Sequence, residues 1–336
     1  MTAKEKSRHL LSVENDSSRK EIEILRVLSE HDRPVGSTLI AQVLGKKGFL
    51  LSERTVRYHL QLLELKGLAK GHNRSGRTIT PLGLRELANT MVFQRMGFVT
   101  TRFLSLAYEV TYQPDTSRGE VVANVSIINK DFHDKTLEII ESLHEKGFLT
   151  APYIKVLDET EEYKDIYVPK GKIALFTVCN LAIDGVFLNL GIPILFKYGG
   201  PVQFVDNQPV RFVDLISYEG TTIPPLEVFV YRNATSILSV LRTGSGLIPA
   251  NLREIPAAAE EKAEKILADL RKKEWHGILK FGKPNESILG VPVAMDRIGI
   301  SMIGGLTPAA ALREIGAKID TFAPHCLMPV EDMTQV

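Results

Sequence analysis

The sequence predicts an α/β (α+β) protein of two domains, a small helical one near the N-terminus and a larger mixed one behind it. A chain of 336 residues is long for one ordinary domain, and its 44 % hydrophobic content is enough for two cores. Charge is unevenly divided, because residues 1–90 hold 16 Lys/Arg against 10 Asp/Glu and the remainder holds 25 against 30. Beyond Phe93, apolar β-branched stretches alternate with helical patterns. We therefore expect a flexible N-terminus at 1–18, a helical domain at 19–90 and an α/β domain at 91–330.

Four helices are predicted in the N-terminal domain. The first runs from Arg19 to His31, the second ends at Gly45, and the third lies between the N-cap Ser52 and Gly67. A fourth starts at Pro81, with Thr80 as its N-cap. The expected inward residues recur at helical spacing: Ile22, Leu25 and Leu28; Leu39, Ile40, Val43 and Leu44; Val56, Leu60 and Leu63.

The third helix and the segment after it predict contacts to nucleic acid. Arg and Gln side chains on the outer face of this helix can make bidentate hydrogen bonds to base edges in a major groove. The following LAKGHNRSGRTITP reads as a hairpin with a basic tip, and three helices followed by such a hairpin is the order of a winged helix-turn-helix domain. From Lys46 to Arg77 there are eight Lys/Arg and two Asp/Glu. A solvated helix face, or a domain used only for protein contacts, is the alternative. The predicted contacts to double-stranded DNA are Ser52, Arg54, Thr55, Arg57, Tyr58, Gln61, Lys70, His72, Asn73, Arg74 and Arg77.

The larger domain is predicted to contain two pseudo-repeated halves. The stretches TRFLSLAYEVTY, EVVANVSIIN, KIALFTVC and GVFLNLGIPILF read as strands, whereas HDKTLEIIESLHEKG and AAAEEKAEKILADLRKK read as helices. A Gly-Ile/Val-Pro-Ile/Val sequence at Gly191 recurs at Gly290, and a Gly-Gly pair follows each copy. A cleft between two such halves is a natural place for a ligand.

An anion site is predicted in the larger domain from glycines and threonines that precede helices starting with proline. Gly304 and Gly305 precede Thr307, the expected N-cap, and Pro308, and free N–H groups at a helix start attract a carboxylate or phosphate. Arginines nearby in the sequence could clamp a carboxylate. The alternative is that these residues only mark where helices begin and end and bind no ligand. The candidate ligand-binding residues are Gly199, Gly200, Arg211, Thr221, Thr222, Arg253, Gly304 and Gly305.

Several function classes receive no support from the sequence. GxSxG, HExxH, Walker A and GxGxxG motifs are missing, so we expect no enzyme, no cofactor and no metal; His325 beside Cys326 is the one adjacent pair that suggests a nucleophile. The two cysteines, Cys179 and Cys326, are far apart and predict neither a disulfide framework nor a zinc site. The long apolar stretch NLAIDGVFLNLGIPILF is interrupted by Asp184, so we expect a cytoplasmic protein with no membrane span.

Long motifs punctuated by glycine and proline carry a resemblance to a known family. GIPILFKYGG, RFVDLISYEGTTIPPLEVFV, GLIPANLREIP and GKPNESILGVPVAMDRIGISMIGGLTPAAALREIG resemble the regulatory domain of the archaeal nitrogen-regulatory repressors of the NrpR family. The N-terminal segment is similar to the winged helix that precedes this domain, so the resemblance covers nearly all of the chain after about residue 19.

The resemblance implies a transcriptional repressor of nitrogen-assimilation and nitrogen-fixation genes that binds palindromic operators and is released by 2-oxoglutarate. A palindrome implies a homodimer or a higher oligomer. Some members carry two regulatory domains in tandem, whereas this sequence has room for one, so a second protein with NrpR-type regulatory domains is a candidate partner. The alternatives are an α/β enzyme that acts on a small carboxylate and regulates its own gene, and an adaptor whose winged helix only dimerises.

Overall fold

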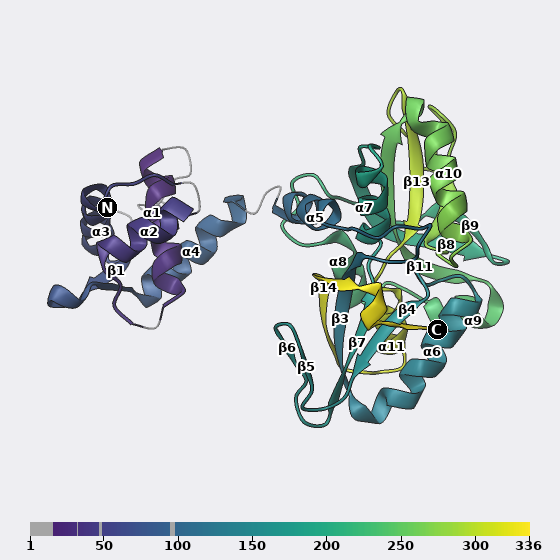
Figure 1. The fold of residues 1–336 in the computed structure, drawn as a ribbon, viewed down its shortest axis with the longest axis horizontal. Coiled ribbons are helices and arrows are strands. Elements are labelled where there is room, and N and C mark those ends of the chain that lie inside the picture. The colour runs from purple at the N-terminus through teal and green to yellow at the C-terminus, as the bar shows by residue number, and fades with distance from the viewer. Residues whose placement is uncertain (1–15, 32, 47–48, 95–97) are drawn as a thin grey trace, which may run out of the picture. The chain divides into compact units, whose positions relative to one another are not determined.

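A computed structural model describes residues 16–31, 33–46, 49–94 and 98–336 (Figure 1). The expected flexible N-terminus therefore lies outside the described residues, except for 16–18, which are helical. The chain splits into two compact units, residues 1–96 and 97–336. We call them the N-terminal unit and the regulatory unit.

The N-terminal unit has three helices, a hairpin and a closing helix, which confirms the predicted winged helix-turn-helix order. Ile22, Leu25, Leu28, Ile40, Leu44, Val56, Leu60 and Leu63 form its core as predicted. Leu39 was expected to face inward but is exposed, because it lies on the outer side of its short helix. The elements are α1 (Asp16–Ser29), α2 (Ser37–Lys46), α3 (Glu53–Leu65), β1 (Ala69–Gly71), the 3-10 turn η1 (Asn73–Ser75), β2 (Arg77–Ile79) and α4 (Pro81–Gln94).

The hairpin is fixed to the helices at its base. Strands β1 and β2 pair antiparallel from Ala69 opposite Ile79 to Gly71 opposite Arg77, and Arg77 also bridges to Val35 before α2. Gly76 has a φ of +110°, and a side chain there would clash with the Val35 backbone. The predicted N-cap Thr80 accepts a hydrogen bond from the Gly83 N–H at 2.9 Å.

The described part of the regulatory unit contains two large sheets with helices packed on them and a small two-stranded sheet of β5 and β6 (Figure 1). One sheet has the order β14-β3-β7-β4-β15, and the other has the order β10-β8-β11-β13-β12, with β9 also paired to β8. Its helices are α5 (Phe98–Tyr108), α6 (His133–Glu145), α7 (Leu181–Asn189), α8 (Pro225–Tyr231), α9 (Ile237–Thr243), α10 (Glu260–Arg271) and α11 (Thr307–Glu314), with 3-10 turns η2 (Lys130–Phe132), η3 (Ala257–Ala259) and η4 (Val330–Asp332). Its strands are β3 (Glu120–Asn129), β4 (Tyr153–Leu157), β5 (Glu162–Tyr163), β6 (Ile166–Tyr167), β7 (Lys172–Val178), β8 (Leu195–Val205), β9 (Gln208–Phe212), β10 (Ile216–Ser217), β11 (Gly246–Pro256), β12 (Ile278–Phe281), β13 (Arg297–Ile303), β14 (Ile319–Pro329) and β15 (Thr334–Gln335).

The element order repeats along the regulatory unit, as predicted, but in a different register. The series β3-η2-α6-β4-β7-α7-β8 recurs as β11-η3-α10-β12-β13-α11-β14. The last strand of each half joins the sheet of the other, because β8 pairs with β11 and β14 pairs with β3. The predicted match of Gly191 with Gly290 is wrong. Gly191 ends α7 and corresponds to Gly316 after α11, whereas Gly290 lies in a turn between β12 and β13.

Two predicted strands lie partly in helices. TRFLSLAYEVTY lies mostly in α5, and GVFLNLGIPILF begins inside α7. Helix α7 is buried from Leu181 to Phe187, so it is buried on all sides and lacks the periodicity that identifies a surface helix. The other predicted strands and helices are confirmed as β3, β7, α6 and α10.

Candidate nucleic-acid interface and ligand site

Helix α3 presents the predicted polar face to solvent. Ser52 caps its N-terminus, since the Thr55 N–H donates to Ser52 Oγ at 3.1 Å. Val56, Leu60 and Leu63 are buried, whereas the four outer residues, Arg54, Arg57, Tyr58 and Gln61, are exposed. The Tyr58 ring is 57 % exposed although it is aromatic. The arrangement exposes three hydrogen-bonding side chains and an aromatic ring on one side of a capped helix.

A carboxylate that the sequence analysis did not single out holds one of these arginines. Arg57 Nη2 lies 2.5 Å from Glu53 Oε1, and Ser37 Oγ donates to the same oxygen at 3.1 Å. Hydrogen bonds from Ser37 and Arg57 lower the pKa of Glu53. The spacing of four residues between Glu53 and Arg57 was the available signal, but the contact from Ser37 comes from α2 and has no local signature.

A second carboxylate connects α3 to the base of the hairpin. Glu64 Oε1 accepts a hydrogen bond from the Gly71 N–H at 3.1 Å, and Glu64 Oε2 lies 3.0 Å from Arg77 Nη2. Arg77 is thereby tied to the protein, whereas Lys70 on β1 is exposed. His72 Nε2 is hydrogen-bonded to Thr78 Oγ1 at 2.8 Å, and Asn73 is exposed with a φ of +47° at the tip. The side chain of Arg74 lies outside the described residues.

An ion pair fixes α3 to α1 beneath this surface. Lys66 Nζ lies 2.6 Å from the Oε2 of Glu21, which is buried, and the buried His59 packs beside the same carboxylate. Because Lys66 caps the C-terminus of α3, this contact fixes the end of the helix that leads into the hairpin. His59 is therefore structural, as its place near the buried edge of α3 predicted.

Most of the predicted ligand residues do not form a site. Gly199 and Gly200 lie inside β8 rather than before a helix, and added side chains would clash with Pro225 and with the Asp214 backbone. Arg211 is exposed on β9, where it donates to Gln203 Oε1 at 3.0 Å. Thr221 turns back on its own loop, and its Oγ1 donates to Ile223 O, while Thr222 lies beside it in that loop. Helix α8 after this loop spans only Pro225–Tyr231.

Arg253 was predicted to clamp a ligand carboxylate, but its partner is internal. Its Nε and Nη2 each lie 3.2 Å from Asp184 Oδ2, and both residues are 0 % exposed. The guanidinium lies 4.4 Å from the Phe196 ring centre and 5.1 Å from that of Tyr218. Sequence reasoning had no way to pair Asp184 with Arg253, because one lies on α7 and the other on β11.

The start of α11 retains the properties of a ligand site. Gly304 and Gly305 precede it and are buried, and they border a small cavity of about 10 Å³ together with Thr150 and Pro308. Thr307 is the first helical residue and Leu306 the N-cap, one position from the prediction. An added Cβ at Gly305 would lie 2.5 Å from Asn124 Nδ2.

Unpartnered polar atoms surround Gly305. Among the described residues, both amide atoms of Asn124 are buried without a hydrogen-bond partner, as are Asn180 Nδ2 and Thr150 Oγ1. Each buried polar group without a partner lowers the free energy of unfolding by about 1–3 kcal/mol. A cluster of such groups at one place is therefore strongly destabilising. The sequence signal was the Gly-Gly pair alone, because Asn124, Thr150 and Asn180 come from other elements.

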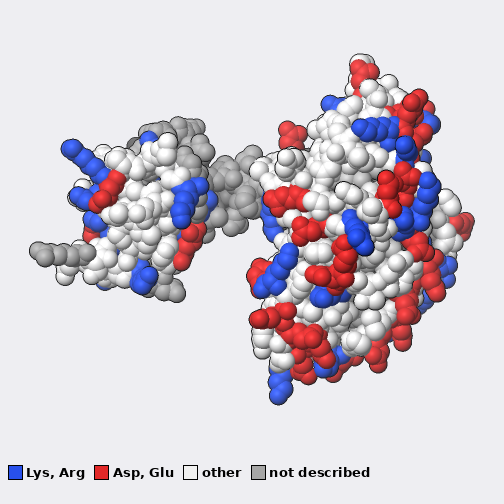
Figure 2. Space-filling model, in the orientation of Figure 1, with Lys and Arg blue, Asp and Glu red and all other residues white. Residues whose placement is uncertain are grey.

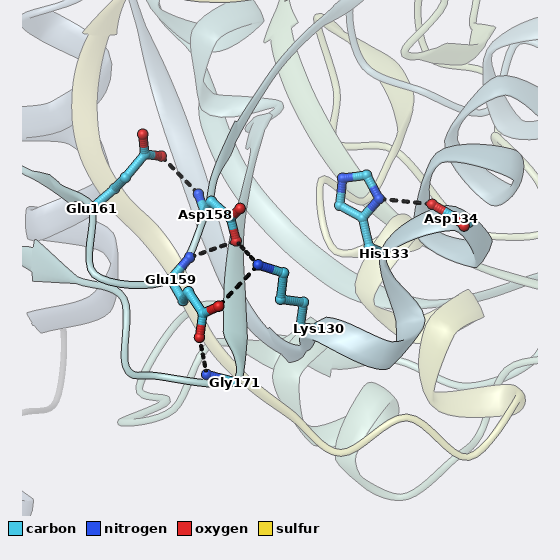
Figure 3. A network of polar contacts seen from close by, with 7 residues as sticks. All are labelled: Lys130, His133, Asp134, Asp158, Glu159, Glu161 and Gly171. Carbon is cyan, nitrogen blue, oxygen red and sulfur yellow. Dashed lines mark hydrogen bonds and ion pairs between the residues drawn. The ribbon is translucent and has the colours of Figure 1, made fainter.

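A surface network lies elsewhere on the regulatory unit (Figure 3). Lys130 Nζ bridges Asp158 at 2.8 Å and Glu159 at 3.0 Å, and Glu159 accepts a hydrogen bond from the Gly171 N–H. These contacts raise the pKa of Lys130 and lower that of Asp158. The network attaches the loop that carries β5 and β6 to η2. Figure 2 shows acidic and basic side chains interspersed over the visible face of this unit.

Within the described ranges, no helix is long and apolar enough to cross a membrane. Among the same residues, no group of three or more His, Cys, Asp or Glu side chains is placed to hold a metal ion.

Family models match both units. Residues 96–335 match the model described as NrpR regulatory domains NRD1 and 2. Residues 22–87 match the model described as the Ribonuclease R winged-helix domain. Among solved structures, a nitrogen repressor-like protein from Methanococcus jannaschii is similar, with 27 % identity and a TM-score of 0.60; the match covers 70 % of this chain and 96 % of that one.

Three curated relatives are similar over most of the chain. The Global nitrogen regulator NrpRI of Methanosarcina mazei is 38 % identical over 95 % of this chain and 98 % of that protein. Proteins named Global nitrogen regulator NrpR from Methanocaldococcus jannaschii and Methanococcus maripaludis are 35 % and 31 % identical, over 89 % and 94 % of this chain. The matched regions make up 52 % and 55 % of those two proteins, so this chain spans about half of their length.

Proposed function

Because the chain belongs to the NrpR family of nitrogen regulators, we propose that it represses nitrogen-assimilation and nitrogen-fixation genes by binding palindromic operators, from which 2-oxoglutarate releases it. The outer face of α3 is the observation that carries DNA binding. Arg54, Arg57 and Gln61 supply donors suited to base edges, and the hairpin supplies Lys70 for phosphate. A palindrome requires a two-fold assembly, with two α3 helices about 34 Å apart along the DNA.

A mobility-shift assay on a nitrogen-gene promoter tests this function. The wild-type chain is expected to shift the promoter fragment but not a random duplex, and 2-oxoglutarate is expected to abolish the shift. Arg57→Ala should weaken the preference for the promoter. Arg271→Ala is the matched control, because it removes an exposed arginine from α10. Equal affinity of the wild-type chain for both duplexes would contradict the proposal.

We place the effector site at the start of α11, around Gly304 and Gly305. The amide N–H donors of Asn124 and Asn180, which have no hydrogen-bond partner among the described residues, suit the carboxylate and keto oxygens of 2-oxoglutarate. The cavity of about 10 Å³ holds roughly one water molecule. Binding would therefore have to move the segment 148–154, which lines it. Linkage then requires operator DNA to weaken 2-oxoglutarate binding by the same factor as 2-oxoglutarate weakens DNA binding.

Asn124→Leu tests this site without weakening the fold. Since both amide atoms of Asn124 lack partners, an apolar side chain of similar shape should be neutral or stabilising. The variant is expected to bind the promoter normally and to ignore 2-oxoglutarate. Ser301→Ala is the control, because the Ser301 hydroxyl is also buried without a partner in the described part of the chain but lies opposite Leu252 in the sheet. A normal response of Asn124→Leu would rule the site out.

Partners and catalysis are addressed by two further measurements. A second protein with NrpR-type regulatory domains is part of the proposal, and co-purification from an archaeal host tests it. The adjacent His325 and Cys326, which suggested a catalytic base and nucleophile, give the alternative of an enzyme little support. His325 is bonded to Asp165 at 3.0 Å, and burial raises the pKa of the Cys326 thiol, which makes it a weaker nucleophile. Quantitative recovery of intact 2-oxoglutarate after incubation is the expected result.

A further inference from the structure

The contacts of one recognition-helix arginine suggest how its orientation is set. We propose that Glu53 is a positioning residue that holds the Arg57 guanidinium in the orientation in which its remaining N–H groups meet a base edge. This inference rests on the proposed DNA binding and assigns a new role within it. Arg57 Nη2 lies 2.5 Å from Glu53 Oε1, and the same oxygen accepts a hydrogen bond from Ser37 Oγ at 3.1 Å.

The contact from Ser37 separates this pair from an ordinary ion pair along one helix. Ser37 belongs to α2, so the Glu53 carboxylate is held from two helices and its orientation is fixed relative to the body of the unit. Hydrogen bonds from Ser37 and Arg57 also lower the Glu53 pKa, so the carboxylate is charged at neutral pH. Arg54, one residue further along α3, has no side-chain partner within the described part of the chain.

Pre-orientation changes what Arg57 can do on DNA. A guanidinium has five N–H donors, and the contact with Glu53 leaves donors for a bidentate pair with guanine O6 and N7. An arginine that is already ordered loses less conformational freedom on binding. The neighbouring negative charge also weakens the attraction of Arg57 to phosphates, which are present in every sequence. Glu53 should therefore increase discrimination among sequences and reduce affinity for random DNA.

The test measures base preference in the full-length chain. Fluorescence anisotropy measures DNA binding by the wild type and five variants. The variants are Glu53→Gln, Glu53→Asp, Ser37→Ala, Arg57→Ala and the double variant Glu53→Gln/Arg57→Ala. The duplexes are the promoter site, its single-base variants and a random sequence. Circular dichroism and thermal unfolding identify any variant that misfolds, and Ser37→Ala provides a second test because it keeps every charge.

The variants should affect one operator position. We expect Glu53→Gln to reduce the preference by about threefold to tenfold at the base pair that Arg57→Ala affects, and to tighten binding to random DNA. Ser37→Ala should reduce the same preference and leave random DNA unchanged. Glu53→Asp, which keeps the charge on a shorter side chain, should behave like Ser37→Ala. In the Arg57→Ala background, Glu53→Gln should no longer alter base preference.

Three results would overturn the positioning role. They are an unchanged preference in Glu53→Gln, a change at a base pair other than that of Arg57, and an additive effect in the Arg57→Ala background. The second would mean that Glu53 contacts a base itself. These results are distinct from failure of the proposed function, in which the wild-type chain would show no preference among duplexes and this role would fail with it.

Discussion

Removal of Arg253 should unfold the regulatory unit at a much lower urea concentration. Asp184 is 0 % exposed, so Arg253→Ala leaves its carboxylate buried without its ion-pair partner. Breaking a buried ion pair in this way costs about 3–5 kcal/mol. The loss of the guanidinium also removes its contacts with Phe196 and Tyr218, which lie within 5.1 Å. If the free energy of unfolding falls by about 3 kcal/mol per M urea, the urea concentration at the unfolding midpoint should fall by about 1–2 M.

The single tryptophan of the chain makes this measurement specific to one unit. Trp275 is 1 % exposed and donates to the Tyr112 hydroxyl at 3.1 Å, so its fluorescence reports unfolding of the regulatory unit alone. Arg211→Ala is the matched control, because this arginine is exposed on β9 and its loss should change stability by less than about 0.5 kcal/mol.

A double variant separates loss of the ion pair from loss of packing. Arg253→Met with Asp184→Leu removes both charges and keeps apolar volume, so it should recover most of the stability. The reasoning fails if Arg253→Ala unfolds at the same urea concentration as Arg211→Ala. It also fails if the double variant is no more stable than Arg253→Ala, because the unpaired charge would then not be the cause.

Three further outcomes are expected. Arg57→Ala should cost about 1–3 kcal/mol at the promoter and relax base preference, measured by anisotropy with Arg271→Ala as control; equal loss on random DNA would argue against base contacts. Lys70→Ala should weaken all duplexes alike and reduce the salt slope by about one, so an unchanged slope would exclude a phosphate contact. Burial raises the pKa of Glu227 from 4.5 to about 7, against the opposing charge of Arg102. Because this folded-state pKa is above the unfolded value, the associated stability is present below about pH 4.5 and is lost as pH rises through about 7. Glu227→Gln should remove that loss of stability, which is about 1–2 kcal/mol for a partly exposed group. The prediction is contradicted if the urea midpoints of wild type and variant change by the same amount between pH 5 and 8.

The N-terminal unit was predictable from local signals. The cap at Ser52, the proline at Pro81 and the apolar period of α3 act within a few residues of one another. The exposed face of α3 followed from the same periodicity, although the role of its side chains on DNA stays a prediction. The contacts of Glu64 could not be predicted, because its partners lie across the hairpin and no local spacing indicates them.

The regulatory unit depended more on contacts between distant segments. Its strands β3 and β7 were predicted, but the buried helix α7 was mistaken for a strand because burial on all sides removes the helical pattern. The exchange of β8 and β14 between the two halves is also invisible to local reasoning, since strand pairing is set by which faces can be buried together.

The amino-acid sequence by itself determined the order of elements in the N-terminal unit, the presence of two halves behind it and the residues on the outer face of α3. Tertiary structure alone decided that Arg253 pairs with Asp184 and that Asn124 lies beside Gly305. The physical reason is range. Caps and helical periodicity act over one or two turns, whereas a buried charge or amide takes its partners from whichever strands and helices the fold places beside it.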